Sequence, residues 1–176
     1  IEIGDYAGTL PSNEAGHDQT PWATFGQANQ LYSPLQLANY IATLCGGGER
    51  YTTHLLKNVR SSGSGTLEYV YDAAPVETVS VSSENLSAVL AGMHDLAADG
   101  AVSSYFKDCI VDAAAKTGTI QTGDAKNNNG AFVCFAPYDD PQIAVAIVIE
   151  KGGTGAALAS TAVQVLNAYF SNASAS

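Results

Sequence analysis

The sequence predicts an α+β fold in which an antiparallel sheet is flanked by helices on both faces. Three strand-like segments follow one another late in the chain, at residues 117–122, 131–136 and 143–149. The connections between them are short and turn-like, which favours an antiparallel meander. Apolar residues at helical spacing occur before and after these strands, at 35–45, 86–97 and 158–169. We expect the last of these helices to pack on the sheet.

The length and composition suit one domain or a large part of one. The chain has 176 residues, of which 46% are hydrophobic. We divide it into an irregular opening segment (1–31), a mainly helical stretch with short strands (33–110), and the meander with its C-terminal helix (111–170).

The charge of the chain argues against two classes of partner. Lys and Arg number 7 against 17 Asp and Glu, so the formal net charge is −10. Such a surface repels phosphate backbones and does not attract anionic lipid, so we expect neither nucleic-acid binding nor membrane contact from this segment. The longest apolar run, Ile143–Ile149, has the length of a strand and not of a membrane span.

The three cysteines do not form a recognisable framework. Cys45, Cys109 and Cys134 are an odd number at wide spacings, without the Cys-x-x-Cys or Cys/His pattern of a zinc site. We expect free thiols that are buried or half-buried, and the sequence leaves their redox state open.

The first helix has the clearest boundaries. Ser33 can cap its N-terminus, Pro34 suits the first helical position, and Gln36 completes a capping box. Three consecutive glycines at 46–48 end it.

Two strand-like segments and a second helix come next. Residues 67–71 and 76–81 have strand-like composition. The helix is expected to begin at Ser82 or Ser83 and to end at Gly100. In the meander that follows, the strand at 143–149 is apolar on both faces, so we expect it to be central and covered on both sides.

One tetrapeptide in the first meander strand has residue types that could bind a substrate beside a nucleophile. The ammonium group of Lys116 would attract a substrate carboxylate, and the hydroxyl of Thr117 would hydrogen-bond it. Gly118 lets a second backbone approach, and the N–H of Thr119 would point at a developing oxyanion. A competing interpretation is structural: three alanines and Lys116 would end a helix that a glycine caps.

Several segments, in a fixed order along the chain, resemble one known family. They are Ile1-Glu2-Ile3-Gly4-Asp5-Tyr6-Ala7-Gly8-Thr9-Leu10-Pro11, Thr24-Phe25-Gly26-Gln27, Ser33-Pro34-Leu35-Gln36-Leu37-Ala38, Lys116-Thr117-Gly118-Thr119, Ala131-Phe132-Val133-Cys134-Phe135-Ala136-Pro137, and Ile143 to Gly153 with the final helix. Together they resemble the transpeptidase domain of penicillin-binding proteins, of the high-molecular-weight, monofunctional class B type. The whole chain, residues 1–176, then corresponds to the C-terminal part of one such domain, with a beta-lactamase/transpeptidase-like fold.

The resemblance implies a peptidoglycan D,D-transpeptidase. Such an enzyme cross-links stem peptides that end in D-Ala-D-Ala through a serine acyl-enzyme, and beta-lactam antibiotics acylate the same serine. It needs no metal or organic cofactor. It works at the extracytoplasmic face of the bacterial cell membrane, tethered by an N-terminal segment that this chain does not contain.

Two of the three motifs of the family are missing from the expected positions. The family order is Ser-x-x-Lys, Ser-x-Asn and then Lys-Thr-Gly. Ser104-Tyr105-Phe106-Lys107 and Ser83-Glu84-Asn85 match the first two patterns, but their order is reversed. We interpret the former as a short surface turn and the latter as a helix N-terminus. The nucleophile is therefore expected on an upstream segment of the same domain, and this chain alone is expected to be inactive.

Two other functions are compatible with the same fold. One is a beta-lactamase or D,D-carboxypeptidase, in which water resolves the acyl-enzyme. The other is a non-catalytic module that senses or binds beta-lactams. The blocks at 26–27 and 35–38 favour the transpeptidase.

Overall fold

The computed structural model describes residues 7–10, 20–27, 29–123 and 127–173, and it has the predicted α+β fold. Most of the segment 1–11, which contributes to the family resemblance, lies outside the described residues, as do 124–126 in the first meander connection. The elements in chain order are α1 (Thr20–Ala23), α2 (Pro34–Cys45), β1 (Glu49–Arg50), β2 (Asn58–Arg60), β3 (Leu67–Val70), β4 (Glu77–Thr78), α3 (Ser83–Ala98), α4 (Ser103–Phe106), β5 (Ala114–Ile120), β6 (Asn129–Ala136), β7 (Ile143–Ile149), the 3₁₀ helix η3 (Gly155–Leu158) and α5 (Ala159–Ala173).

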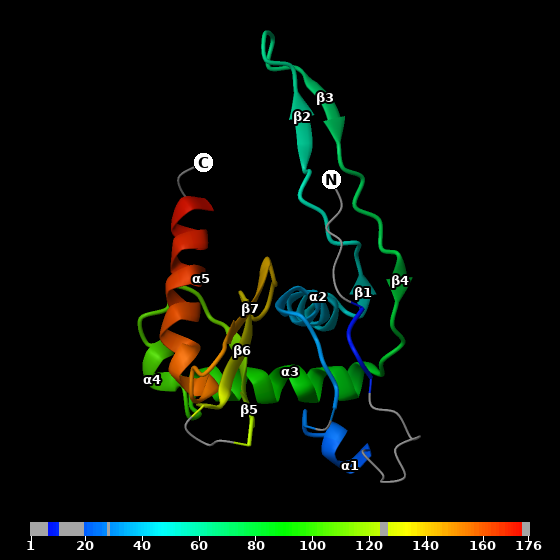
Figure 1. Cartoon of the computed structure of the whole chain (residues 1–176). Helices are drawn as coiled ribbons and strands as arrows, with labels where there is room; N and C mark the ends of the chain where they lie inside the picture. Colours follow the sequence, from blue (N-terminus) through cyan, green and yellow to red (C-terminus); the bar gives the residue numbers. More distant parts are fainter. Residues whose placement is uncertain (1–6, 11–19, 28, 124–126, 174–176) are drawn as a thin grey trace.

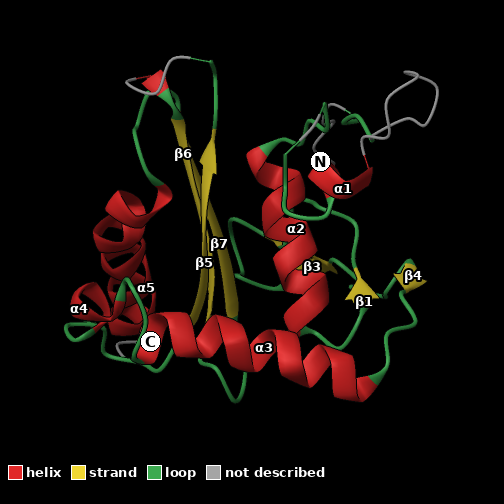
Figure 2. Cartoon of the chain, turned by 90° about the horizontal axis from the view of Figure 1, so that it is seen from below, coloured by secondary structure: helices red, strands yellow, loops and turns green. Residues whose placement is uncertain are grey.

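The last three strands form the predicted antiparallel meander. β5 pairs with β6 and β6 with β7, with Lys116 opposite Val133 and Val133 opposite Ala146. β6 is the central strand, and its residues alternate between half-buried and buried before a fully buried end. Figure 2 shows the three strands between α5 on one side and α2 on the other.

Two apolar clusters lie on opposite faces of this sheet. One joins Ala115, Phe132 and Cys134 to η3 and α5 through residues such as Leu158 and Leu166. The other cluster contacts α2 and α3 and consists of Ile41, Met93, Ala114 and Phe135. Consecutive residues such as Ala114 and Ala115 belong to different clusters because side chains alternate along a strand.

The sequence prediction for β7 was wrong in one respect. β7 has the predicted bounds but lies at an edge of the described three-stranded sheet, and its residues are half-buried or exposed. β7 is apolar on both faces because α2 and α5 each contact part of it. The described strands form three separate small sheets, so the sheet is less extensive than predicted.

The predicted helix boundaries agree with the structure. Ser33 accepts a hydrogen bond from the N–H of Gln36, whose side chain returns to the Ser33 N–H, and Pro34 occupies the first turn of α2. The Ser82 hydroxyl accepts from the Asn85 N–H and so caps α3, which ends at Ala98, two residues before Gly100.

Between these two helices the chain forms an extended arm, residues 51–76, which projects from the body of the molecule (Figure 1). The hairpin of β2 and β3 makes up its outer part, and the sheet of β1 and β4 lies at its base. β3 confirms the predicted strand at 67–71, whereas the predicted strand at 76–81 is reduced to the two residues of β4.

Three local predictions are corrected. β5 begins at Ala114, so the alanines before Lys116 belong to a strand and do not end a helix. Residues 104–107 were expected to be a turn, but Ser103–Phe106 form one helical turn, α4. The opening segment also contains a helical turn, α1.

Two further observations concern the helices and the cysteines. No helix within the described ranges is both long and apolar enough to cross a bilayer. All three cysteines are free, and Cys134 is buried while Cys45 and Cys109 are half-buried, as predicted. Burial raises the pKa of Cys134 to about 12.

Candidate functional site

The tetrapeptide Lys116-Thr117-Gly118-Thr119 lies in an edge strand. β5 pairs with β6 on one side only, and in the described part of the chain no strand pairs with its other side. Lys116 is exposed, and the next three residues are half-buried. The Lys116 amine therefore lies outside the packed core, where a ligand can reach it.

Two hydrogen bonds identify the backbone groups that face the open side of β5. The carbonyl of Thr117 accepts from the Lys116 amine at 2.6 Å, and the carbonyl of Thr119 accepts from the side-chain amide of Gln27 at 3.2 Å. In an antiparallel strand the N–H and C=O of one residue point to the same side. The N–H groups of Thr117 and Thr119 therefore also turn away from β6.

The side chains of the tetrapeptide divide between the two faces of the sheet. Lys116 shares a face with Ala114, which contacts α2 and α3, because residues two apart point the same way. Thr117 and Thr119 share the opposite face with Ala115. The sequence prediction that Lys116 and Thr117 bind one carboxylate thus requires the carboxylate to lie beside the open edge, where both side chains can reach it.

The start of η3 supports the tetrapeptide from the α5 side. The N–H of Gly155 donates to the hydroxyl of Thr119 at 3.4 Å. A Cβ added at Gly155 would collide with the backbone of Gly118 and the carbonyl of Ala131. Only glycine allows η3 to approach the strand this closely.

Gln27 contacts the tetrapeptide, and the sequence did not predict this contact, since the Gly-Gln block contributed only to the family resemblance. Gly26, at φ +83°, lets the chain turn at the end of α1, and its N–H bonds the Ala23 carbonyl. This turn directs Gln27 toward a strand 92 residues further along the chain. The signal available in the sequence was the Gly-Gln pair, which does not by itself indicate the contact with Thr119.

The structure separates the two reversed motifs from the tetrapeptide. Ser83 and Asn85 lie in the first turn of α3, where Asn85 takes part in the cap through its N–H. Ser104 is exposed on α4, and Lys107 follows that helical turn. Neither match is part of the strand that carries the tetrapeptide.

A small hollow lies away from the tetrapeptide. It has a volume of about 130 Å³ between α3, α4 and the residues before β5. Its lining includes Ser103, Lys107 and Asp112 and ends at Ala113, so it does not reach Lys116. Across the described residues, no group of three or more His, Cys, Asp and Glu side chains could hold a metal ion.

Comparison with known proteins agrees with the resemblance. The sequence pattern of the family described as penicillin binding protein transpeptidase domain matches residues 3–170. Penicillin-binding protein 2A of Bacillus subtilis is 32% identical over 131 residues, covering 67% of this chain and 18% of that protein. The peptidoglycan D,D-transpeptidase MrdA of Salmonella typhimurium is 26% identical, covering 73% of this chain and 23% of that protein.

Solved structures show the same similarity. Penicillin-binding protein 2B of Streptococcus pneumoniae matches with a TM-score of 0.80 and 25% identity, over 94% of this chain and 29% of that one. PBP2 of Pseudomonas aeruginosa, solved with WCK 5153, matches with a TM-score of 0.73 and 26% identity, over 95% and 39%. The chain thus spans between about a fifth and two fifths of the length of these relatives.

Proposed function

Because the chain belongs to the penicillin-binding protein transpeptidase family, we propose that it supplies the substrate-binding edge strand of a peptidoglycan D,D-transpeptidase. The observation that carries the proposal is the geometry of β5. Its tetrapeptide presents an exposed amine, two half-buried threonines and a row of outward-facing backbone groups on the unpaired side of a strand.

We assign the binding of the substrate carboxylate to Lys116, Thr117 and Thr119. The ammonium of Lys116 attracts the C-terminal carboxylate of a D-Ala-D-Ala stem peptide, and the hydroxyl of Thr117 donates to it, with Thr119 in contact with the substrate. Such charge-assisted hydrogen bonds are stronger than neutral ones. Gly118 lets the peptide backbone approach the strand without a Cβ in the way.

The reaction needs a serine that we place on an upstream segment of the same domain. Its hydroxyl oxygen attacks the carbonyl carbon between the two D-alanines, and the N–H of Thr119 stabilises the oxyanion that forms. The C–N bond then breaks, the terminal D-alanine leaves, and an acyl-ester remains. An amine of a second stem peptide attacks this ester, which forms the cross-link and releases the serine. A beta-lactam reacts at the same serine by opening its ring.

The remaining assignments follow from this proposal. The reaction requires no metal or organic cofactor, because serine, lysine and hydrogen-bond donors supply the chemistry. The parent enzyme works at the extracytoplasmic face of the bacterial cell membrane, where its substrate is. This chain alone is inactive, since β5 provides one wall of the site and the nucleophile provides the other.

Labelling with fluorescent penicillin tests the proposal. We expect no label on this chain alone, and label on the upstream segment once the two are combined. In the combined protein, Lys116→Ala should slow acylation about 12- to 160-fold, because a hydrogen bond to a charged group contributes roughly 1.5–3 kcal/mol.

Lys107→Ala and Ser104→Ala are the matched controls for this test. Both residues belong to the reversed motif on α4, and neither substitution should change the acylation rate. Label attached to Ser104, or an unchanged rate in Lys116→Ala, would contradict the assigned roles.

A further inference from the structure

We propose that Gln27 is a displaceable cover for the substrate edge, and that a bound peptide must replace its side-chain amide at the carbonyl of Thr119. The inference rests on the proposed function and adds a residue that controls ligand affinity. It starts from the hydrogen bond between the Gln27 side-chain nitrogen and the Thr119 oxygen, at 3.2 Å.

The position of this contact is the first reason. An unpaired strand edge offers a row of backbone donors and acceptors to any extended peptide. The Thr119 carbonyl is one of the acceptors on the open side of β5, and the Gln27 amide occupies it with the same N–H group that a peptide backbone would present. The two donors therefore compete for one acceptor.

The support behind Gln27 is the second reason. The side-chain amide of Gln30 donates to the carbonyl of Gln27 at 2.9 Å and to that of Ala23 at 3.3 Å. The hydroxyl of Tyr32 in turn donates to the side-chain oxygen of Gln30 at 3.2 Å. These contacts hold the backbone of Gln27, whereas its side chain keeps its rotatable bonds and can swing aside.

The chemistry of the cover is the third reason. Gln27 is neutral, so it does not compete with a substrate carboxylate for the ammonium of Lys116. It covers only the acceptor beside the predicted oxyanion donor, the Thr119 N–H. A ligand that places a backbone N–H opposite the Thr119 carbonyl replaces the hydrogen bond that Gln27 gives up. A ligand without such an N–H either leaves this carbonyl unpaired or leaves Gln27 in place.

Removing the donor should therefore strengthen ligand binding. A net hydrogen bond contributes roughly 0.5–1.5 kcal/mol, which corresponds to about 2- to 12-fold in affinity. In the combined protein, we expect Gln27→Leu to lower the Kd of an extended D-Ala-D-Ala peptide, measured by calorimetry, by this factor. The second-order rate of penicillin acylation should rise by a similar factor, with the first-order acylation step unchanged.

Three controls separate this role from a structural one. Gln27→Met also removes the donor, keeps a neutral side chain of similar length, and should change the affinity in the same direction. Gln164→Leu, at an exposed position of α5, should change neither affinity nor rate. Thermal unfolding of each variant shows whether the loop has lost its structure, and a purely structural role would lower stability without tightening binding.

The outcomes distinguish the two proposals. Normal acylation of the unaltered protein with equal or weaker peptide binding in Gln27→Leu and Gln27→Met overturns the role of Gln27 and leaves the transpeptidase intact. An unaltered protein that neither binds the peptide nor reacts with penicillin overturns both. Tighter binding confined to the two Gln27 variants supports the cover.

Discussion

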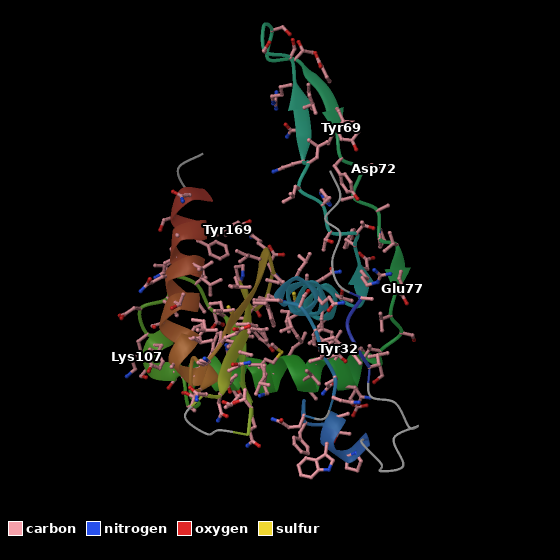
Figure 3. All side chains as sticks on the ribbon, in the orientation of Figure 1. Tyr32, Tyr69, Asp72, Glu77, Lys107 and Tyr169 are labelled. Carbon is pink, nitrogen blue, oxygen red and sulfur yellow. The ribbon has the colours of Figure 1, made fainter. Side chains whose placement is uncertain are left out.

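The body and the arm both contain antiparallel strands, but only the body buries them. In β6 most residues are buried, and Phe135 is 0% exposed. In the arm every residue of β2 and β3 is exposed, including Val59, Leu67 and Tyr69. Figure 3 shows Tyr69 on the hairpin at a distance from the helices and sheet of the body.

The difference shows that the strands of this chain are stabilised in two ways. Burial of apolar surface, at about 25 cal/mol per Å², dominates in the body. In the arm, local contacts hold the two legs together, such as the stacking of His54 on Tyr71 with ring centroids 3.5 Å apart and the bond from the Tyr71 N–H to the Lys57 carbonyl. An isolated two-stranded hairpin has little stability of its own.

Matched aromatic deletions should show the contrast most strongly. We expect Phe135→Ala to destabilise the fold by about 3–5 kcal/mol, because the change leaves a cavity in a packed core. Tyr69→Ala should change stability by less than about 0.5 kcal/mol. Urea unfolding followed by circular dichroism measures both values, and equal losses would show that the arm and the body unfold as one packed unit.

The cysteines provide a second comparison, between the centre of the body and the end of α2 near the base of the arm. Burial raises the pKa of Cys134 to about 12 from a usual 9.0, so its thiolate fraction at pH 8 falls by about three orders of magnitude. Burial also raises the pKa of Cys45. In a thiol titration, Cys45 should react in the folded protein and Cys134 only on unfolding.

The same pKa shift predicts an effect of alkaline pH on stability. The folded state binds the Cys134 proton more tightly than the unfolded state does. The contribution of the protonated thiol to the free energy of unfolding is therefore complete below about pH 9, and it is lost as the pH rises toward about 12. Cys134→Ala should remove this part of the alkaline loss. A Cys134 that reacts as fast as Cys45 at pH 8 would contradict its burial.

Two pairs of polar side chains give the smallest expected effects. In the body, the imidazole of His94 lies 2.9 Å from the carboxylate of Asp112 and stacks on Tyr138. At the base of the arm, the guanidinium of Arg50 lies 2.9 Å from the carboxylate of Glu77. We expect Asp112→Asn and Glu77→Gln each to cost about 0–1 kcal/mol, with the larger loss for Asp112. Thermal unfolding at low and high salt provides the measurement, and a larger loss in Glu77→Gln would reverse the ranking.

The elements with several agreeing local signals could be predicted from the sequence. The capping residues and terminal glycines of α2 fix its ends within one turn, and the apolar run of β7 gives its bounds. The Lys-Thr-Gly-Thr motif predicted a candidate site in the strand that the structure shows as β5. These features depend on short-range preferences that are visible in a few neighbouring residues.

Features that depend on distant contacts could not be predicted in the same way. The apolar pattern of β7 is the same for an edge strand under partial cover as for a central strand, so its place in the sheet was missed. The extent of β4 depends on its pairing with two residues of β1. The contact of Gln27 with Thr119 depends on how the α1 turn packs against β5, which no local pattern encodes.

The role that we propose for main-chain groups in β5 has a consequence for how such a site can vary in evolution. Residue 119 provides the same carbonyl and N–H with any side chain except that of proline, which removes the N–H, so most substitutions there leave both groups in place. Mutations that weaken the hydrogen bonds between a ligand and these backbone groups then act by moving the strand. Gly155 is one place where such a displacement can arise, because a single added methyl group would collide with the backbone of Gly118. If β5 binds the ligand as we propose, a substitution at Gly155 would weaken penicillin acylation from a position outside the tetrapeptide.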